Sequence, residues 1–438
     1  MMHDALNLET LVIVLAGGEG SRLWPLTELR TKPAVPIGAK YRLIDIPLSN
    51  AFNSGLHNLD VLTQGKDASL GEHIKNTWPS DPRHNSSVRV ISPQSLEINY
   101  EGDADAVRHV RHNIQDFCPK YVLVVPGDHL LKMDYSKFIK AMKDSGADGA
   151  ISLIPRDLEY ASQLGSININ SSARITELRE KDPQTPLRVP GSETQFYASM
   201  GIYAFTTHAI LDAMNLEGNL FGRHILPQII DRMNIIGYDY QANNHIPDRV
   251  RLEQDGYMQM QDVERSKDSD YWRDVGTIGE FFEANMDLVS IDPAFNLYNN
   301  KWKFFTYRPE EGPAKIVQAT NSIVSSGTVM TDIQGGDNVI STSCYIDKST
   351  LNKVIVFDHA NIQRSSIQNT IVDKNTVVWG MDIGYDAERD INLGIWVDED
   401  SGIRVVPKKY NSTNQKSVDH WRRVFDMKRD EIARKNKK

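Results

Sequence analysis

Residues 11–27 read LVIVLAGGEGSRLWPLT, and this stretch largely decides the expected fold. Its first five residues, Leu11–Leu15, form a short apolar run rich in β-branched side chains, which is typical of a buried strand. The strand is followed at once by a loop with three glycines, Gly17, Gly18 and Gly20. Because glycine has no side chain, the backbone amides of this loop can approach a bound phosphate closely. We therefore predict a nucleotide-binding loop formed by Leu15, Ala16 and these glycines.

The spacing of the glycines distinguishes this loop from two common nucleotide-binding motifs. It does not match G-x-G-x-x-G, and no Gly-Lys-Ser/Thr follows as it does in a Walker loop. Two cations come next, the planar guanidinium of Arg22 and the compact ammonium of Lys32. Either residue alone is usually a surface charge, but beside a glycine loop at the end of a strand both favour phosphate binding. We predict Arg22 and Lys32 as catalytic residues.

The first two thirds of the chain alternate between short apolar runs and longer amphipathic stretches. Further strands are expected at Leu59–Thr63, Tyr121–Val125 and Gly149–Ile154. Helices are expected at Pro47–Ser54, Ala104–Phe117 and Tyr135–Ser145. This alternation predicts an α/β domain over residues 1–300, with a mainly parallel, Rossmann-like sheet whose ligand site lies at the carboxyl ends of its strands.

The pattern changes after about Pro313, where helical periodicity disappears. Aliphatic residues then recur at six-residue spacing in the pairs Ile323/Val329, Ile340/Ile346, Val356/Ile362 and Ile371/Val377. A period just under eighteen residues fits an imperfect left-handed β-helix over residues 301–419, although an ordinary β-sandwich or meander is the alternative. Residues 420–438 are expected to form a charged, amphipathic and mainly solvated C-terminal helix.

Composition excludes several classes of protein. The 438 residues carry a formal net charge of −9, from 49 Lys and Arg against 58 Asp and Glu, so we expect no nucleic-acid partner. The two cysteines, Cys118 and Cys344, lack the spacing of a disulfide framework or a zinc site. The apolar run Leu11–Ala16 is too short to span a membrane, and no signal-peptide pattern precedes it. We expect a cytoplasmic protein with no membrane partner.

Two acidic residues suggest a metal site. Asp128, in Gly127-Asp128-His129, follows the expected strand at Tyr121–Val125, and Asp274 lies in the stretch YWRDVGT at 271–277. A lone Gly-Asp pair is more often a turn. A pair of carboxylates, however, provides the hard oxygen ligands that magnesium prefers, and a strand's carboxyl end is where such a ligand can meet reacting phosphates.

At this point a family resemblance becomes specific. The segment Leu15–Val35 resembles the amino-terminal signature of sugar-nucleotide pyrophosphorylases, and GAKYRLIDIPLSNAFNSG at 38–55 resembles the ADP-glucose pyrophosphorylases in particular. The resemblance covers nearly the whole chain. It implies that ATP and glucose 1-phosphate are converted to ADP-glucose and pyrophosphate for glycogen- or starch-type polysaccharide synthesis. It also implies Mg²⁺ held by Asp128 and Asp274, allosteric control and a homotetramer.

The resemblance also implies residues that bind the sugar phosphate. Glu180-Lys-Asp-Pro183 resembles the family's Glu-Lys-Pro motif with one residue inserted, so Lys181 is expected to bind the phosphate and Glu180 the sugar hydroxyls. Ser199, in ASMGIY at 198–203, and Gly165 take the corresponding sugar-facing positions.

The stretch NYEGDADAV at 99–107 resembles a family segment that borders the nucleotide and sugar pockets. Tyr100 is expected on the sugar-phosphate side and Gly102 on the nucleotide side. Two residues depart from the pattern, because Asp103 stands where the family has Thr or Ser and Asn99 replaces an aromatic residue. An extra negative charge is therefore expected near the triphosphate.

Two alternatives stay open. The first is a pyrophosphorylase that uses another nucleotide and sugar, because fold and phosphate chemistry do not fix either specificity. The second is a catalytically weak regulatory subunit, which Asp103 favours and the retained charges at Arg22 and Lys181 oppose. Leu29 stands where well-studied bacterial members carry a basic residue linked to activation, so the effector response is not carried over.

Overall fold

The computed structural model describes residues 2–18, 20–65, 67–81, 83, 85–93, 99–254 and 256–435. These residues form two compact units, each built from separate stretches of chain. The first, here called the sheet unit, comprises Met1–Glu19, Ile44–Trp272 and Tyr298–Phe305. The second, here called the coil unit, comprises Gly20–Leu43, Arg273–Leu297 and Thr306–Lys438.

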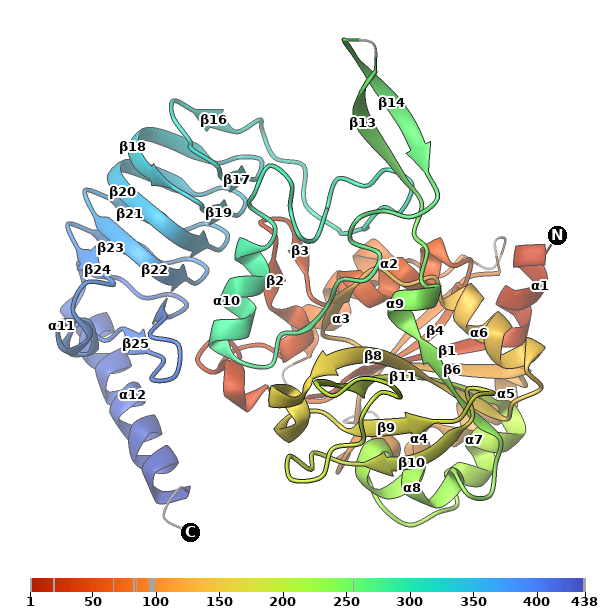
Figure 1. Ribbon diagram of the computed structural model, residues 1–438. Coiled ribbons are helices and arrows are strands. Elements are labelled where there is room, and N and C mark those ends of the chain that lie inside the picture. Colours follow the sequence, from red (N-terminus) through yellow and green to blue (C-terminus); the bar gives the residue numbers. More distant parts are fainter. Residues whose placement is uncertain are drawn as a thin grey trace. The chain divides into compact units, whose positions relative to one another are not determined.

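The sheet unit is built on β1 (Thr10–Ala16), whose residues are almost all buried. β1 pairs in parallel with β4 (Asn58–Thr63) on one side and β6 (Tyr121–Pro126) on the other, in keeping with the predicted mainly parallel sheet. The nine-stranded sheet has the order β10-β9-β11-β6-β1-β4-β5, and β8 joins β11 to β12 (Figure 1). The other strands are β5 (Ser87–Ile91), β8 (Gly149–Asp157), β9 (Ser166–Ile169), β10 (Ile175–Arg179), β11 (Gln195–Thr206) and β12 (Ile235–Asp239).

Nine α-helices of the sheet unit lie within its described residues. They are α1 (Met2–Glu9), α2 (Asp45–Asn53), α3 (Ala68–Thr77), α4 (Asp103–His109), α5 (Arg111–Phe117), α6 (Tyr135–Asp144), α7 (Thr207–Ala213), α8 (Leu226–Ile229) and α9 (Tyr240–Asn243). The prediction of one helix over 104–117 was wrong, because the chain breaks at Val110. The Arg108 guanidinium donates to carbonyl oxygens of the loop at 214–218, so a tertiary contact shapes this turn against the local periodicity.

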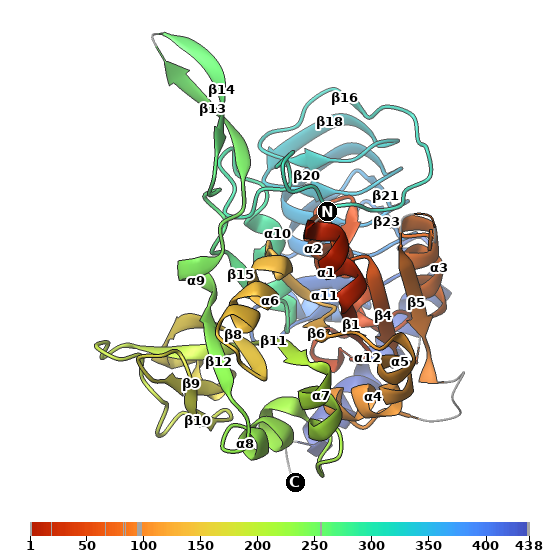
Figure 2. The same cartoon turned by 90° about the vertical axis from the view of Figure 1, so that its right-hand side faces the viewer.

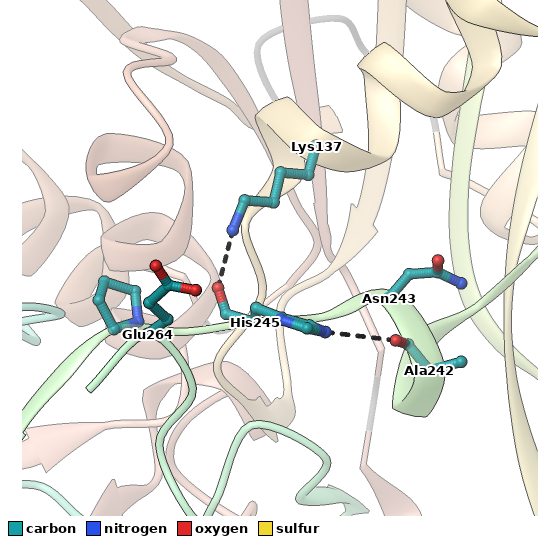
Figure 3. A pocket seen from close by; sticks show the side chains of 6 residues that line it. Lys137, Ala242, Asn243, His245 and Glu264 are labelled. Carbon is teal, nitrogen blue, oxygen red and sulfur yellow. Dashed lines mark hydrogen bonds between the residues drawn. The ribbon is translucent and has the colours of Figure 1, made fainter.

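An antiparallel hairpin of β13 (Asp248–Gln254) and β14 (Tyr257–Val263) projects from the sheet unit, as Figures 1 and 2 show. A pocket of about 500 Å³ is lined by Lys137, Ala242, Asn243, His245, Pro247 and Glu264 (Figure 3). In it, the Lys137 ammonium donates to the carbonyl oxygen of His245 over 2.8 Å. The pocket contains none of the residues predicted for the functional site.

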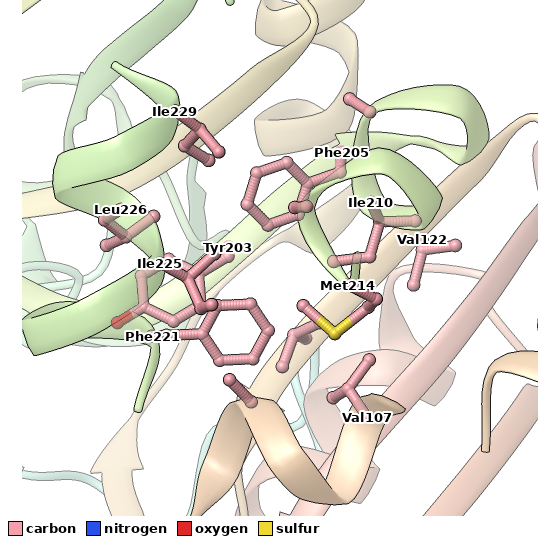
Figure 4. Packing of buried hydrophobic residues seen from close by; sticks show 14 of the residues in the cluster. Val107, Val122, Tyr203, Phe205, Ile210, Met214, Phe221, Ile225, Leu226 and Ile229 are labelled. Carbon is pink, nitrogen blue, oxygen red and sulfur yellow. The ribbon is translucent and has the colours of Figure 1, made fainter. Parts of the chain in front are cut away.

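The core of the sheet unit lies between the sheet and helices α4, α5, α7 and α8. Alternate residues of β1 enter it, namely Leu11 and Ile13, as the two-residue period of a strand requires. Figure 4 shows Phe221 packed among side chains of this cluster, with its ring centroid 5.2 Å from that of Tyr203. Phe221 begins a short π-helical turn, η6 (Phe221–Ile225), that leads into α8. Within the described residues, no helix combines the length and apolar character needed to cross a membrane.

The C-terminal part of the coil unit is a stack of parallel β-coils, visible in Figure 1 as β18, β20 and β22. Its strands are β16 (Lys315–Ile316), β17 (Ile323–Val324), β18 (Val329–Gly336), β19 (Val339–Ile340), β20 (Tyr345–Val356), β21 (Asn361–Gln363), β22 (Ser366–Val372), β23 (Val377–Trp379), β24 (Asp382–Ile383), β25 (Trp396–Val397) and β26 (Arg404–Val406). Within the described residues of the stack, all strands pair in parallel except β25 with β26, and this parallel pairing of successive coils excludes the sandwich and meander alternatives.

The coils repeat every 16 residues rather than every 17 or 18. Ile340 pairs with both Val324 and Val356, and Ile346 pairs with Ile362, in successive coils. The two central pairs of the predicted pattern, Ile340/Ile346 and Val356/Ile362, are fully buried. In the last predicted pair, Val377 is not buried, and its neighbour Val378 is fully buried instead. Residues with positive φ recur at the corners in three series, 321/337/353/369, 332/348/364/380 and 327/343/359/375. These left-handed corners recur with the same 16-residue period as the coils, which is two residues short of three full hexapeptides.

The coil unit also contains α10 (Ile278–Met286), α11 (Ala387–Asn392) and α12 (Gln415–Lys435). Helix α12 begins five residues earlier than predicted, and residues 436–438 lie outside the described part. It is not merely solvated, because Trp421 and Phe425 are buried and the Phe425 ring contacts Trp24 and Trp396 edge-on. This aromatic cluster fixes one face of the helix.

Candidate active site

The predicted site residues fall into two groups, one in each unit. In the sheet unit, the ends of β1 and β6 lie side by side, with Leu15 opposite Pro126. The amide of Gly127 donates to the carbonyl oxygen of Leu15 over 2.9 Å, and a side chain at Gly127 would meet that oxygen at 3.0 Å. Asp128 therefore lies at the beginning of the glycine loop, as expected for the carboxyl ends of neighbouring parallel strands.

Gln64, which was not predicted, links the glycine loop to the segment at Tyr100. A Cβ built on Gly17 would lie 3.3 Å from the Cβ of Gln64, whose amide nitrogen donates to the carbonyl oxygen of Tyr100 over 3.2 Å. Its position directly after β4 was the available signal, because this strand neighbours β1. A Cβ built on Gly18 has no described atom within 4 Å, so this glycine fills no packing position.

Glu180 is the centre of the group expected to face the sugar. Its Oε2 lies 2.6 Å from a Cβ built on Gly165 and 2.9 Å from one built on Gly222. Both positions must be glycine if the carboxylate is to keep this place. The structure thus brings together Gly165 and Glu180, both of which were expected to face the sugar, and adds Gly222, which was not predicted.

The charge around Glu180 is mixed. Burial raises the pKa of Glu180, Lys181 and Arg223 lower it, and the negative charge of Asp103 raises it. The carboxylate is therefore held in a partly desolvated place where a hydrogen-bond donor would stabilise its ionised form.

Ser199 lies on β11, a strand whose residues alternate between buried and half-buried. Its hydroxyl oxygen accepts a hydrogen bond from the amide of Gly201 at 3.3 Å and is hydrogen-bonded to the buried phenol of Tyr203. Burial also raises the pKa of Tyr203 well above its usual range, and the charges of Asp103 and Glu180 contribute in the same direction. Ser199 and Glu180 therefore share Tyr203 as a neighbour.

Lys181 has an exposed side chain and a backbone φ of +51°, which non-glycine residues seldom adopt. The next residue, Asp182, is the insertion relative to the family motif. Its carboxylate accepts hydrogen bonds from the amides of Gln184 and Thr185 and from the Thr185 hydroxyl. The insertion is thus accommodated as a turn closed by its own side chain, and a strained backbone at Lys181 is a common feature of ligand-binding positions.

The segment at 99–107 is held in place by close packing and by hydrogen bonds. Tyr100 is buried, and Gly102 packs so closely that a Cβ there would lie 2.1 Å from the carbonyl oxygen of Asn219. Asp103 accepts hydrogen bonds at Oδ1 from the amides of Ala104 and Phe221, both at 2.8 Å. Gly102 is therefore required by packing, whether or not it also approaches the nucleotide.

In the coil unit, Gly20 has a φ of +63°, and a Cβ built there would lie 2.9 Å from the Cβ of Lys32. The Lys32 ammonium forms an ion pair of 3.1 Å with Asp274, the carboxylate predicted to bind metal. A Cβ built on Gly276 would lie 3.2 Å from the exposed Arg22 guanidinium. The coil unit thus brings together Gly20, Lys32 and Asp274, and places Arg22 against the segment that follows Asp274.

Two further contacts flank the predicted aspartates. The Trp272 indole nitrogen donates to His129, the residue after Asp128, over 3.3 Å. The Arg156 guanidinium stacks over the Trp272 ring at 5.1 Å and donates to the Trp272 carbonyl oxygen over 2.9 Å. These residues were not predicted, and only the proximity of His129 and Trp272 to the two aspartates in the sequence pointed to them.

Among the described residues, no group of three or more His, Cys, Asp or Glu could hold a metal ion. Mg²⁺ is usually bound through one or two carboxylates, several waters and the phosphates of the substrate. Asp128 and Asp274 each carry a hard oxygen donor of this kind, and Asp274 also forms the ion pair with Lys32. Each aspartate is therefore of the chemical type that binds magnesium.

Comparison with known proteins identifies the class. Residues 11–290 match the nucleotidyl transferase family, and residues 307–406 match the GlmU-like C-terminal hexapeptide family. The protein is thus a nucleotidyltransferase whose catalytic domain is followed by a left-handed β-helix.

Sequence identity to individual relatives narrows the class to one family of nucleotidyltransferases. The glucose-1-phosphate adenylyltransferase of Leifsonia xyli subsp. xyli is 38% identical over 90% of this chain and 96% of its own length. Proteins of the same name from Koribacter versatilis and Bifidobacterium longum are 34% and 36% identical, covering 94% and 92% of this chain and 99% and 98% of their own. The chain belongs to the glucose-1-phosphate adenylyltransferase family.

Proposed function

We propose that this protein transfers the adenylyl group of ATP to α-D-glucose 1-phosphate, giving ADP-glucose and pyrophosphate for storage-polysaccharide synthesis. A phosphate oxygen of glucose 1-phosphate attacks the α-phosphorus of ATP. The bond from that phosphorus to the oxygen bridging to the β-phosphate breaks, and pyrophosphate leaves. The grouping of Glu180 with Gly165 and Gly222, beside Lys181 and at the edge of a nucleotidyltransferase sheet, is the observation that carries the proposal.

The chain's own residues act by positioning and by charge, because two anions that repel each other must meet. Arg22 and Lys32 neutralise the triphosphate, and Lys181 neutralises the sugar phosphate. Glu180 accepts hydrogen bonds from sugar hydroxyls. Asp128 and Asp274 would hold Mg²⁺, which would offset charge on the transferred group and on the departing pyrophosphate.

The substrate pair is tested directly by pyrophosphate release from the purified chain. ATP, GTP, UTP and dTTP are each supplied with glucose 1-phosphate and with mannose 1-phosphate. We expect the highest kcat/KM for ATP with glucose 1-phosphate. A higher value for another pair would establish the alternative specificity, and no release from any pair would leave the regulatory-subunit alternative. The shared name of the relatives does not favour either alternative.

The role of Lys181 gives a separate prediction. Replacing it with alanine removes one charged contact to the sugar phosphate, so we expect the KM for glucose 1-phosphate to rise about 10- to 100-fold, while kcat and the KM for ATP change little. Steady-state kinetics with each substrate varied in turn measures both constants. Lys143→Ala, which removes an equally exposed ammonium from α6, is the control, and equal effects of the two variants would contradict the assignment.

We also propose that the protein is a cytoplasmic homotetramer under allosteric control. β16, the first strand of the β-helix, has both of its residues exposed, and exposed strands at the end of a sheet commonly need covering. Leu29, at the position linked to activation in the family, is 48% exposed, whereas the adjacent Arg30 is buried in an ion pair with Asp373. Light scattering of the purified chain measures the subunit number, and a mass other than four subunits would contradict this part.

A further inference from the structure

Asp103 is one of the residues at which the chain departs from its family's pattern, and its hydrogen bonds show which segments it joins. Its Oδ1 accepts the amide of Ala104, at the start of α4, and the amide of Phe221, at the start of η6, each at 2.8 Å. One carboxylate oxygen therefore satisfies amides from two helical turns that are more than 100 residues apart in the sequence. Exposed amides at a helix start otherwise need such an acceptor.

Hydrogen bonds in the opposite direction link the same two segments. The carbonyl oxygen of Asn219 accepts the amides of Ala104 and Asp105 at 3.0 and 3.3 Å. Within segment 219–224 itself, Nδ1 of His224 accepts the amides of Asn219 and Leu220 at 3.1 and 3.2 Å. The segment is thus closed on itself by His224 and joined to α4 by hydrogen bonds in both directions, one of which the Asp103 side chain accepts.

This segment supports the sugar-facing carboxylate. The Phe221 ring is buried in the core, so the backbone at 221–222 is held by its ring on one side and by Asp103 at its amide. Gly222 lies against Glu180, because a Cβ built on Gly222 would be only 2.9 Å from Oε2 of Glu180. Any shift of this backbone changes the space in which the Glu180 carboxylate lies.

We propose that Asp103 is a positioning residue for the sugar-phosphate half of the site. It acts through the Phe221–Gly222 backbone on Glu180, and its acceptor oxygen, not its charge, is the property that matters. The proposal rests on the proposed function, in which Glu180 binds the sugar. It explains how an acidic residue can replace Thr or Ser, because a hydroxyl oxygen can accept the same amide hydrogen bonds.

Three variants separate these properties. Asp103→Leu removes the acceptor but keeps a side chain branched at Cγ, whereas Asp103→Asn and Asp103→Thr keep an acceptor oxygen without the charge. An orphaned amide beside the site displaces the segment, so we expect Asp103→Leu to raise the KM for glucose 1-phosphate about tenfold or more. The KM for ATP should stay within about twofold, and Asp103→Asn and Asp103→Thr within about threefold of the wild type for both substrates.

Glu101→Leu is the matched control, because the exposed Glu101 carboxylate accepts a hydrogen bond from the Asn219 side chain of the same segment and not from its backbone amides among the described residues. We expect it to leave both KM values within about twofold. An unchanged KM for glucose 1-phosphate in Asp103→Leu would overturn the proposal. An equal rise of this KM in Asp103→Asn and Asp103→Leu would overturn it as well.

A second variant tests the same step if Asp103→Leu does not fold. Gly222→Ala leaves Asp103 intact but places a methyl group against Glu180, and the proposal requires the same selective rise in the KM for glucose 1-phosphate. An unaltered KM would show that this backbone does not position Glu180. If the wild-type chain forms no nucleotide sugar, the proposed function fails. If the wild type is active and the variants match it, only the role of Asp103 fails.

Discussion

We expect the Asp128→Asn protein to turn over about 10²- to 10³-fold more slowly than the wild type, which is the scale seen when a preorganised electrostatic contact to a transition state is lost. Asn has the same shape as Asp, but it is a weaker ligand for a hard cation. Asp128 follows Gly127, whose amide is held by the Leu15 carbonyl oxygen, so the loop should keep its place. Steady-state kinetics at saturating Mg²⁺ measures kcat.

The control for this variant is Asp144→Asn, which removes a carboxylate at the exposed end of α6, where it pairs with Lys140. It should leave kcat unchanged. A kcat for Asp128→Asn equal to that of the control would remove Asp128 from the reaction and from the metal site. Removal of Mg²⁺ with a chelator should abolish the turnover of the wild type. It should reduce the already slow turnover of Asp128→Asn by a smaller factor.

The second large effect is on stability. Lys132 and Asp268 form an ion pair of 2.7 Å with side chains that are 0% and 4% exposed. The Asp268→Asn variant removes the carboxylate that pairs with the buried ammonium, and we expect the free energy of unfolding to fall by about 3–5 kcal/mol. Urea denaturation of the full chain, followed by fluorescence and by circular dichroism, measures the change.

This loss should depend on pH in a defined direction. Burial lowers the pKa of Lys132, and Asp268 opposes that shift, so loss of Asp268 lowers the pKa further. The folded variant then releases the Lys132 proton at a lower pH than the unfolded chain does. The penalty is therefore greatest at neutral pH and shrinks as the pH rises toward 10.5, the usual lysine value. Asp144→Asn again serves as the control, because its exposed pair should contribute less than about 1 kcal/mol.

The parallel core of the sheet was predictable because its strands are buried on both faces. Runs such as Leu11–Leu15 and Tyr121–Val125 are continuously apolar, and the structure extends each by only one or two residues. The break at Val110 was not predictable, since it depends on Arg108 reaching carbonyl oxygens about 110 residues away. Local periodicity carries no information about such a contact.

The coil was predictable in kind but not in its exact period. Inward aliphatic residues such as Ile346 and Ile362 reveal stacked coils, but each coil is 16 residues long and has left-handed corners at residues such as Lys348 and Arg364. Neither lysine nor arginine is a residue that signals positive φ. The side-chain pattern therefore located the domain, while the corner geometry depended on the pairing of successive coils.

The candidate site was partly predictable for the same physical reason. Glycine loops and strand-end carboxylates are visible in a sequence, so Gly17 and Asp128 could be singled out. The ion pair between Lys32 and Asp274 joins residues more than 240 positions apart, and it links two roles that had been assigned separately. Gln64 and Gly222 were missed, because each has its position defined by contacts rather than by a motif.

The central claim is that one chain joins two phosphate esters and expels pyrophosphate. Its most direct test is to incubate the purified protein with ATP, glucose 1-phosphate and Mg²⁺, and to quantify ADP-glucose and pyrophosphate together. We predict that both products appear in equal amounts and that neither forms when glucose 1-phosphate is omitted. Pyrophosphate or phosphate released without ADP-glucose, or no product at all, would contradict the account.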